Sequence, residues 1–342
     1  MSAGPVAGVI GAGAWGTALA QVLAGDGAPV RLWAREEEVV RSISENRVNA
    51  AFLPDIPLAE TVLPTNDLVD LADCPALLVV APAQHLRGVL GALPSGNAPL
   101  VLCAKGIEAE TGQLMCEVAR EAAPGRAIAI LSGPTFAHEV ARGLPAAVTL
   151  ACESEALWDN LAPRIARPAF RPYYSDDLIG AEIGGAVKNV LAIGCGVVAG
   201  AGLGLNARAA LIGRGFAEMT RFGLARGARA DTLSGLSGLG DLVLTCSSEN
   251  SRNFSLGKGL GEGTPAAELL SNRRTVAEGA ATAPVLAREA AKHGVDMPIV
   301  EAVGHLLDGS FGVDEVIAGL LARPLRAERP QEPTVSPSER QS

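Results

Sequence analysis

Short apolar runs alternate with amphipathic or turn-rich segments through the first half of the chain. Each run has the length of a buried strand, and this alternation is typical of a parallel, doubly wound sheet covered by helices. We therefore expect residues 1–180 to form an α/β domain. The predicted strands are residues 6–10, 30–33, 76–81, 100–103, 127–131 and 146–151.

The pattern changes after residue 180. Long segments rich in Ala, Leu and Gly follow without strand alternation, and they predict an all-α domain over residues 181–325. Residues 171–177, with Pro, Tyr and a charge pair, mark the expected boundary. The tail, residues 326–342, has almost nothing to bury and is expected to be disordered. The predicted helices are residues 181–200, 207–227, 265–270, 282–293, 299–307 and 313–321.

A glycine-rich turn joins the first predicted strand to a helical segment. Gly11, Gly13 and Gly16 form a GxGxxG pattern. The first glycine allows a tight turn, the second lets the backbone approach a pyrophosphate, and the third permits close helix-to-strand packing. The helix N-terminus then offers N–H groups to the phosphates. A mere tight turn is the alternative in so glycine-rich a chain, but the strand–turn–helix context favours a Rossmann-like dinucleotide site.

The end of the second predicted strand bears on the choice between NAD and NADP. An acidic residue there binds the ribose 2′-hydroxyl of NAD, whereas an arginine accommodates the 2′-phosphate of NADP. Arg35 stands at this position, followed by Glu36, Glu37 and Glu38. Arg35 favours acceptance of NADP without excluding NAD, and the glutamates can equally form the solvated start of a helix.

Composition narrows the possible partners. The chain of 342 residues has a formal net charge of −9, which argues against nucleic acid and anionic membranes but not against a small anion. Its 6 cysteines and 4 histidines lack the spacing of a disulfide framework or a zinc site, so we predict no metal and a reducing, cytoplasmic setting. The most apolar stretch, residues 190–205, is shorter than the roughly 20 residues of a bilayer span, so no integral membrane contact is expected.

Two lysines lie in apolar or glycine-rich surroundings. Lys105 follows a predicted strand, at the edge where open α/β sheets bind ligands. Lys188 lies in the most apolar helical segment, where neighbours three and four positions away offer no charged partner. Burial lowers the pKa of a lysine and suits it to proton transfer near neutral pH. The alternative is a lysine whose ammonium group reaches water.

Two further segments collect polar groups. Residues 237–253 combine small residues with Asp, Thr, Ser, Arg and Asn, a set suited to a phosphate or a polyol, although Asp241 could instead cap a helix. Residues 131–139 place a Gly-Pro turn and a hydroxyl at the carboxyl edge of the sheet. His138 and Glu139 are adjacent on a helix and face apart, so we interpret them as helix surface rather than a proton relay.

Motifs spread over about residues 6–323 together resemble those of one enzyme family. They are GxGxWGTALA at residues 11–20, AKGIE at 104–108, LSGPTFAHEVARGLP at 131–145, GGAVKNVLAIG at 184–194, SGLGDLVLTCSSENSRN at 237–253 and VAEG at 276–279. The chain resembles the NAD(P)-dependent glycerol-3-phosphate dehydrogenases. The resemblance implies a Rossmann-like domain followed by a helical substrate-binding domain, and a homodimer.

The resemblance also assigns roles to residues. It implies a cofactor site formed by Gly11, Gly13, Ala14, Trp15, Gly16, Arg35, Lys105, Ala137, Arg252, Val276 and Glu278. It implies a substrate site formed by Lys105, Gly133, Thr135, Lys188, Asn189, Asp241, Ser251, Arg252 and Asn253. Lys188, assisted by Lys105 and Asp241, would be the proton donor or acceptor.

These roles imply reversible hydride transfer between NAD(P)H and C2 of dihydroxyacetone phosphate, which gives sn-glycerol 3-phosphate for glycerophospholipid synthesis. A protonated lysine would neutralise the charge that grows on the carbonyl oxygen. One alternative is a related dehydrogenase with a helical C-terminal domain, acting on a hydroxy acid or ketopantoate. Another is a dinucleotide-binding regulator that has lost the chemistry.

Overall fold

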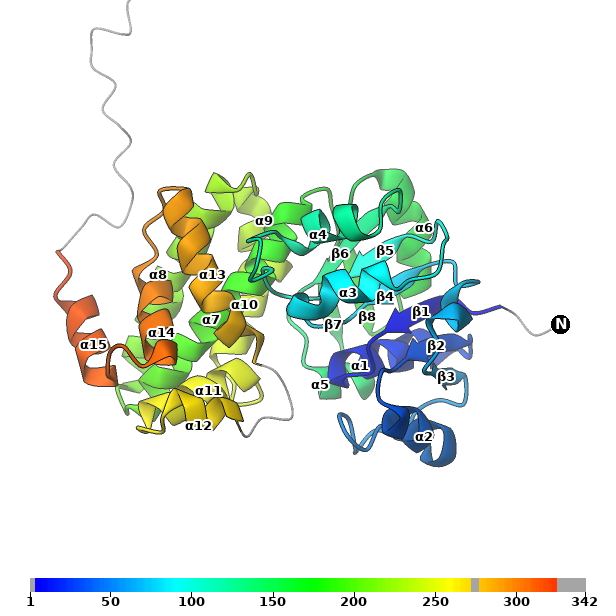
Figure 1. Cartoon of the computed structure of the whole chain (residues 1–342), viewed down its shortest axis with the longest axis horizontal. Helices are drawn as coiled ribbons and strands as arrows, with labels where there is room; N and C mark the ends of the chain where they lie inside the picture. Colours follow the sequence, from blue (N-terminus) through cyan, green and yellow to red (C-terminus); the bar gives the residue numbers. More distant parts are fainter. Residues whose placement is uncertain (1–3, 272–276, 325–342) are drawn as a thin grey trace, which may run out of the picture.

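The computed structural model describes residues 4–271 and 277–324. A sheet flanked by helices forms the N-terminal half, and a group of helices forms the C-terminal half beside it (Figure 1). This confirms the predicted fold class, a Rossmann-like α/β half followed by a helical half. The predicted tail, residues 326–342, lies outside the described residues.

The described residues contain one eight-stranded sheet with the order β3-β2-β1-β4-β5-β6-β7-β8. The chain reverses its direction of travel across the sheet between β1 and β4, and open α/β sheets bind their ligands at such a switch point. The strands are β1 (Ala7–Ile10), β2 (Val30–Trp33), β3 (Val62–Thr65), β4 (Leu77–Val79), β5 (Leu100–Leu102), β6 (Ile128–Ser132), β7 (Ala146–Cys152) and β8 (Phe170–Ser175).

Two features of the sheet differ from the prediction. β7 pairs antiparallel with β6, so the sheet is not parallel throughout. The edge strands β3 and β8 are absent from the predicted set, and β8 occupies most of the segment that the sequence marks as a boundary. Pro64 in β3 and Pro172 in β8 lack the N–H that a ladder uses. Edge strands tolerate such prolines, which weaken the strand signal in the sequence.

Both faces of the sheet are buried. Val9 and Ile10, adjacent on β1 and therefore on opposite faces, belong to separate hydrophobic clusters. The helices of this half are α1 (Ala14–Leu23), α2 (Glu37–Asn46), α3 (Leu86–Gly91), α4 (Met115–Ala122), α5 (Ala137–Ala141) and α6 (Glu155–Ile165), with the 3₁₀ turns η1 (Ala24–Asp26), η2 (Leu68–Leu71) and η3 (Ala83–His85).

Each predicted helical segment of the second half coincides with a helix. The glycine- and serine-rich region between residues 225 and 266 also forms helices, at residues 230–234, 236–246 and 252–261. The elements are α7 (Leu178–Gly200), α8 (Gly204–Ala225), α9 (Ala230–Ser234), the π-helical turn η4 (Leu236–Gly240), α10 (Asp241–Cys246), α11 (Arg252–Gly261), α12 (Ala266–Ser271), α13 (Glu278–Lys292), α14 (Pro298–Asp308) and α15 (Val313–Leu321).

The helix α7 is the central helix of the second half. Asp177 caps its start by accepting the N–H of Gly180 at 2.8 Å. By length and composition α7 could cross a membrane, with a mean hydropathy of 1.6, but 89% of its apolar stretch is buried inside the protein. A helix that is apolar on all sides needs cover from every direction, and neighbouring helices supply it here.

Glycines bring α7 and α11 into direct backbone contact. A Cβ atom at Gly257 of α11 would lie 1.9 Å from the carbonyl oxygen of Ile193. One at Gly196 of α7 would lie 2.1 Å from the carbonyl oxygen of Phe254. These contacts leave no room for a side chain. The glycines that make α11 look like a loop in the sequence are the residues that let it pack.

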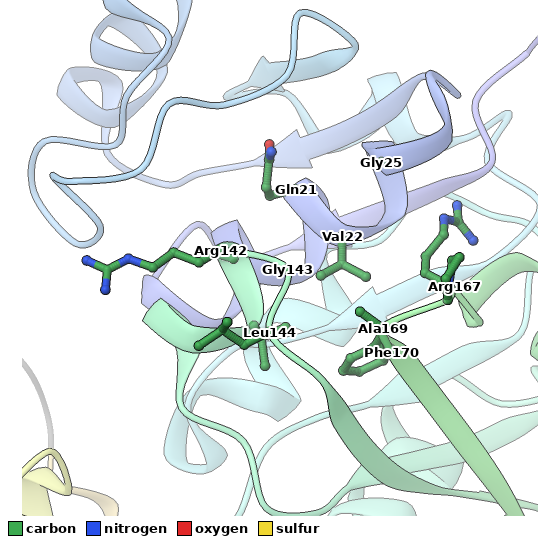
Figure 2. A pocket seen from close by; sticks show the side chains of 12 residues that line it. Gln21, Val22, Gly25, Arg142, Gly143, Leu144, Arg167, Ala169 and Phe170 are labelled. Atoms are coloured by element: carbon green, nitrogen blue, oxygen red, sulfur yellow. The ribbon is translucent and has the colours of Figure 1, made fainter.

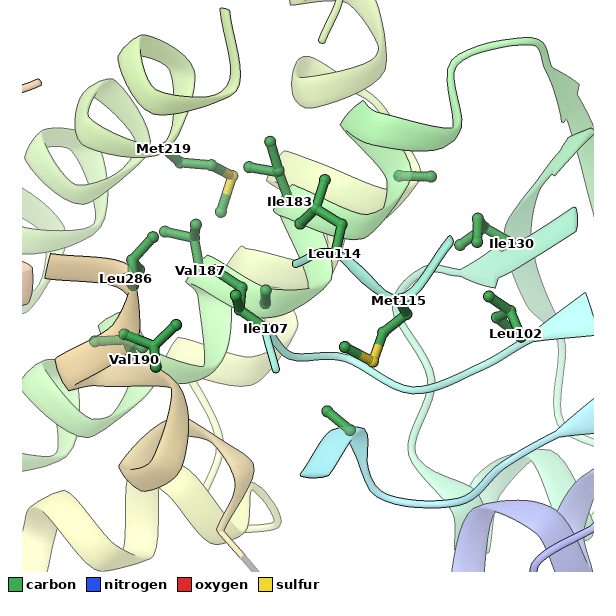
Figure 3. Packing of buried hydrophobic residues seen from close by; sticks show 14 of the residues in the cluster. Leu102, Ile107, Leu114, Met115, Ile130, Ile183, Val187, Val190, Met219 and Leu286 are labelled. Carbon is green, nitrogen blue, oxygen red and sulfur yellow. The ribbon is translucent and has the colours of Figure 1, made fainter. Parts of the chain in front are cut away.

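One hydrophobic cluster runs through both halves of the molecule. It joins Leu102 and Ile130 of the sheet to Ile183 and Val187 of α7, with Met115 of α4 between them (Figure 3). The sheet ends at Ser175 and α7 begins at Leu178, so the change of architecture precedes residue 181 by a few residues. α7 therefore belongs to the helical half by sequence and to the core of both halves by packing.

Candidate active site

Three charged side chains meet between the two halves, two of them buried and the third, Lys105, partly buried. Asp241, the first residue of α10, has 0% of its surface exposed. Its Oδ1 accepts a hydrogen bond from Lys188 Nζ at 2.6 Å, and its Oδ2 accepts one from Lys105 Nζ at 2.7 Å. One carboxylate therefore bridges two ammonium groups, and the cluster keeps a net positive charge. The three predicted catalytic residues lie together.

Close packing brings Asp241 to Lys188. Gly184 lies on α7 one turn before Lys188, and a Cβ atom there would lie 2.4 Å from the carbonyl oxygen of Ser237. This approach places η4 against α7 and aims the start of α10 at the lysine. Asp241 is thus not the helix cap that the sequence left open, because Gly240 occupies that position and the carboxylate binds the lysines.

The environment of Lys188 suits a proton donor that works near neutral pH. Its Nζ donates to Asp241 and to Thr245 Oγ1, the latter at 2.9 Å, and Thr245 in turn donates to Asp241 Oδ1 at 3.2 Å. Burial, reinforced by the charge of Lys105 and opposed by that of Asp241, lowers the pKa of Lys188 from 10.5 to about 8. The two lysines keep the pKa of the Asp241 carboxyl below its usual range despite burial. The carboxylate therefore stays ionised.

Lys105 connects this cluster to the sheet. It follows β5, and its Nζ also donates to the carbonyl oxygen of Gly133 at 3.1 Å. Gly133 follows β6 with a φ of +153°, and its Cβ would lie 2.9 Å from Val148 Cα, so only glycine fits. Thr135 Oγ1 donates to the same carbonyl at 3.3 Å. The predicted substrate residues of the sheet edge thus surround one lysine.

A chain of amide hydrogen bonds links the remaining substrate candidates. Asn189 Nδ2 donates to the carbonyl oxygen of Lys105 at 3.1 Å, and Asn253 Nδ2 donates to Asn189 Oδ1 at 3.0 Å. Asn253 Oδ1 accepts the N–H of Gly279, the second residue of α13, at 3.0 Å. The chain fixes α7, α11 and α13 relative to the sheet edge.

The start of α11 presents a cation beside these amides. Ser251 is the N-cap of the helix, accepting the N–H of Phe254 at 3.2 Å, and Arg252 follows as an exposed first residue. A guanidinium group at a helix N-terminus suits an anionic ligand, because both the fork and the helix dipole favour negative charge. All the predicted substrate residues therefore lie in the region between the sheet edge and the helical half.

The glycine loop fits a dinucleotide phosphate. Gly11 has a φ of +107°, and a Cβ at Gly16 would lie 1.8 Å from the Gly11 carbonyl oxygen, so the turn requires both glycines. Gly13 is exposed, with no atom within 4 Å of the Cβ position. No side chain among the described residues caps α1 at Gly13, which leaves the N–H groups of Ala14 and Trp15 available for an anion.

The other cofactor candidates lie on or next to three different elements. Arg35, just beyond β2, is exposed and pairs with Glu36 at 2.8 Å. Ala137 begins α5, which packs beside α1. Glu278 begins α13, and its Oε1 accepts the N–H of Ala83 at 3.3 Å across the two halves. Burial raises the pKa of the Glu278 carboxyl, partly offset by that hydrogen bond and by Arg252. The predicted Val276 lies outside the described residues.

Three polar residues lie in segments that the sequence analysis singled out but received no individual role there. Thr245 lies four residues after Asp241 on α10, and this spacing, which places both on one helix face, was an available signal. Ser132 Oγ and Ser237 Oγ are buried beside α7 with no hydrogen-bond partner within the described part of the chain, and nothing in the sequence distinguishes them. Among residues 4–271 and 277–324, no cluster of three His, Cys, Asp or Glu side chains could hold a metal.

Two cavities in the described part of the chain lie away from the charged cluster. One, of ≈ 330 Å³, lies between α1, the end of α5 and the chain that enters β8, and includes Val22, Leu144 and Phe170 (Figure 2). The other, of ≈ 390 Å³, lies between α13 and α14. Neither contains a predicted site residue. The candidate active site therefore rests on its charges and hydrogen bonds rather than on cavity size.

Comparisons with known proteins identify the family of the chain. Residues 6–158 match the model of the NAD-dependent glycerol-3-phosphate dehydrogenase N-terminus, and residues 177–318 match that of the C-terminus. The chain belongs to the NAD-dependent glycerol-3-phosphate dehydrogenase family. The resemblance inferred from the motifs is confirmed, as is its class, an oxidoreductase that uses NAD or NADP.

Individual relatives cover almost the whole chain. The glycerol-3-phosphate dehydrogenase [NAD(P)+] of Novosphingobium aromaticivorans is 67% identical over 324 residues, 94% of this chain and 98% of the relative. That of Caulobacter vibrioides is 58% identical over 324 residues, again 94% of this chain and 98% of the relative. The crystal structure of glycerol-3-phosphate dehydrogenase from Coxiella burnetii, 37% identical, superposes with a TM-score of 0.89 and covers 93% of this chain and 100% of that chain.

The alternative dehydrogenases share only the fold. A D-mandelate dehydrogenase and a ketopantoate reductase from Ralstonia eutropha, each 16% identical, superpose with TM-scores of 0.61 and 0.58 and cover 91% of this chain and 99% of theirs. Such identity shows a common architecture and says nothing of the substrate. The family assignment therefore favours the first prediction over both alternatives.

Proposed function

We propose that the protein transfers hydride reversibly between NAD(P)H and C2 of dihydroxyacetone phosphate, giving sn-glycerol 3-phosphate, with Lys188 as proton donor and acceptor. The observation that carries this proposal is the buried bridge of Asp241 between Lys188 and Lys105. The activity in the names of the relatives supports the choice of substrate. The bound nicotinamide supplies the hydride, and the protein supplies the proton and the charge around it.

Lys188 donates its proton to the C2 oxygen as negative charge grows there. With a pKa of about 8, it is protonated in much of the population at neutral pH and neutral in the rest, so it serves either direction. Thr245 and Asp241 hold its Nζ on two sides and leave one N–H for the substrate. Lys105 adds a second positive charge that stabilises the developing oxyanion.

The phosphate of the substrate would bind at the start of α11. Arg252 can offer a bidentate fork, and Ser251 and Asn253 flank it on the same turn. Gly133, Thr135 and Asn189 complete the proposed substrate site from the sheet edge and α7. This arrangement places the anionic end of the substrate on the helical half, residues 181–325, and its carbonyl end near Lys188.

The cofactor would bind across the carboxyl edge of the sheet, within residues 1–180. Its pyrophosphate would bind at the turn from Gly11 to Gly16, which includes Trp15, with Ala137 nearby. Lys105, Arg252 and Glu278 would lie towards the nicotinamide. Arg35 beyond β2 supports acceptance of the 2′-phosphate of NADP as well as NAD.

The cellular setting follows from composition and chemistry. Six buried free thiols and an acidic surface support a cytoplasmic protein whose partners are small molecules rather than nucleic acid. sn-Glycerol 3-phosphate would enter glycerophospholipid synthesis. We also propose that the protein forms the homodimer that the resemblance implies.

The proposal is tested by following NADH or NADPH absorbance with dihydroxyacetone phosphate, ketopantoate and an aryl 2-oxo acid in parallel. We expect turnover only with the triose phosphate. Turnover of a 2-oxo acid without turnover of the triose phosphate would refute the proposed substrate assignment. Lys188→Met should lower kcat by about 10²–10⁴-fold while the Kd for NADPH stays unchanged. Lys292→Met, an exposed lysine, is the matched control. A Lys188→Met enzyme with the activity of the control would remove Lys188 from its role.

A further inference from the structure

A buried asparagine outside the predicted site contacts the glycine loop. Asn49, in the bend that follows α2, has 0% of its surface exposed. Its Nδ2 donates to the carbonyl oxygen of Ala12 and to Thr17 Oγ1, each at 2.8 Å. Its Oδ1 accepts the N–H of Phe52 at 3.2 Å. These partners fix the orientation of the amide, because a flipped side chain would set oxygen against oxygen.

The contact controls a peptide plane in the turn. Ala12 lies between Gly11 and Gly13, and the described residues contain no cis peptide bond. In a trans peptide the C=O and the following N–H point in opposite directions. By binding the Ala12 carbonyl from inside, Asn49 turns the N–H of Gly13 outward, toward the exposed side of the loop. Thr17 Oγ1 donates to the same carbonyl at 3.3 Å.

We propose that Asn49 is a positioning residue for the phosphate-binding turn. It keeps the Ala12–Gly13 peptide in the orientation that offers N–H groups to a dinucleotide pyrophosphate before the cofactor arrives. A preformed donor array binds an anion without the cost of reorganisation, so cofactor affinity depends on a side chain buried beneath the loop. This inference rests on the proposed binding of the pyrophosphate at the glycine loop.

The test measures cofactor affinity directly. The Kd values of the full-length protein for NADH and NADPH are measured by fluorescence in the absence of substrate. Asn49→Ala should raise both by tenfold or more, with a rise in cofactor KM larger than any loss of kcat. Thr17→Val should raise them several-fold, and Thr17→Ser, which keeps the hydroxyl, should restore wild-type binding.

Ser42→Ala is the matched control. Ser42 Oγ donates to the Val48 carbonyl at 2.7 Å and accepts the N–H of Ala50 at 3.3 Å, so it anchors the same bend without reaching the glycine loop. The Kd values of Ser42→Ala for both cofactors should stay within twofold of wild type, even if the Tm of this variant falls as far as that of Asn49→Ala. Equal Kd changes in the two variants, or an unchanged Kd in Asn49→Ala, would overturn the inference.

The Thr17 pair keeps the test decisive if Asn49→Ala does not fold. In that case a Thr17→Val protein that binds both cofactors as tightly as wild type would overturn the inference. The outcomes also separate the two proposals. A wild-type protein that binds neither NADH nor NADPH refutes the proposed function, whereas wild-type binding that is unchanged in the variants refutes only the role of Asn49.

Discussion

The two ends of the candidate site hold charge in opposite ways. Near the proposed reacting end, Asp241 and Lys188 are buried, Lys105 is partly buried, and both lysines bind the Asp241 carboxylate. At the proposed 2′ end of the cofactor, the side chains of Arg35 and Glu36 are 76% and 37% exposed and pair in water. A buried charge depends strongly on each partner, whereas an exposed pair is screened and weak. If the proposed roles hold, substitutions in the buried cluster should therefore affect activity strongly, whereas substitutions at the exposed pair should alter cofactor preference only weakly.

Removing the shared carboxylate should have the largest effect. Asp241→Asn keeps the shape of the side chain but leaves the buried Lys188 and the partly buried Lys105 without a counter-charge. We expect kcat to fall about 10²–10⁴-fold. In the wild type, reduction should weaken as pH rises through about 8, where Lys188 loses its proton. Without the carboxylate the pKa of Lys188 falls, so this decline should move to lower pH.

Steady-state kinetics between pH 5 and 9 measure both effects. Thr245→Val, which keeps the carboxylate and removes only a hydroxyl, should lose less activity and keep the pH midpoint closer to that of wild type. An Asp241→Asn enzyme with wild-type turnover and an unshifted midpoint would show that the bridge is structural only.

The second-largest effect on activity should follow from separating α7 and η4 at Gly184, one turn before Lys188. In Gly184→Ala the new Cβ would meet the Ser237 carbonyl oxygen at 2.4 Å and push η4, with Asp241, away from α7. We expect the free energy of unfolding to fall by about 1–3 kcal/mol, with a loss of kcat that exceeds the fraction unfolded. Urea denaturation and kinetics on the same preparation measure both.

Gly213→Ala on α8 is the control for that substitution. Gly213 is exposed and has no atom within 4 Å of its Cβ position. Alanine there should stabilise the helix by about 0.5–1 kcal/mol without changing kcat. If Gly184→Ala behaves in the same way, close packing does not position Asp241.

The smallest effect is expected at the exposed pair of Arg35 and Glu36. Glu36 binds the guanidinium group of Arg35, through Nε at 3.1 Å and Nη2 at 2.8 Å, and so competes with a 2′-phosphate for it. Glu36→Gln should raise the preference for NADPH over NADH by about two- to fivefold, since an exposed pair contributes at most about 1 kcal/mol. The ratio of Kd values at low and high salt measures the change, which should shrink as salt rises. Glu38→Gln, on the same helix, should not alter the ratio; an equal change there would point to net charge alone.

The sequence predicts the parts of the fold whose signal is local. The strand-length runs and the helical segments appear where their patterns place them, and most of these elements bury their own apolar residues, although α12 and α15 do not. β8 is missed because Pro172 and its exposed tyrosines are compatible with a loop, and only pairing with β7 makes the segment a strand. α11 is missed because Gly257 lowers helix propensity, and the contact that requires this glycine is tertiary.

The sequence predicts which residues belong to the candidate site better than it predicts which of them contact one another. The apolar surroundings of Lys188 and the polar run around Asp241 identify both residues as candidates. Nothing local shows that a carboxylate 53 positions away supplies the missing partner. The same holds for Asn49, whose role depends on a loop 37 positions earlier in the chain. Residues that work by contact across the fold become visible only when the fold is known.

The shared core also has a consequence for synthesis. During translation the sheet is complete once Ser175 has left the ribosome, but the apolar residues around Ile130 and Met115 still lack the helix that covers them. That helix, α7, emerges afterwards and carries Lys188 with it. Part of the apolar surface of the nascent sheet therefore stays uncovered, and exposed to aggregation or chaperones, until the helix that carries Lys188 has been made.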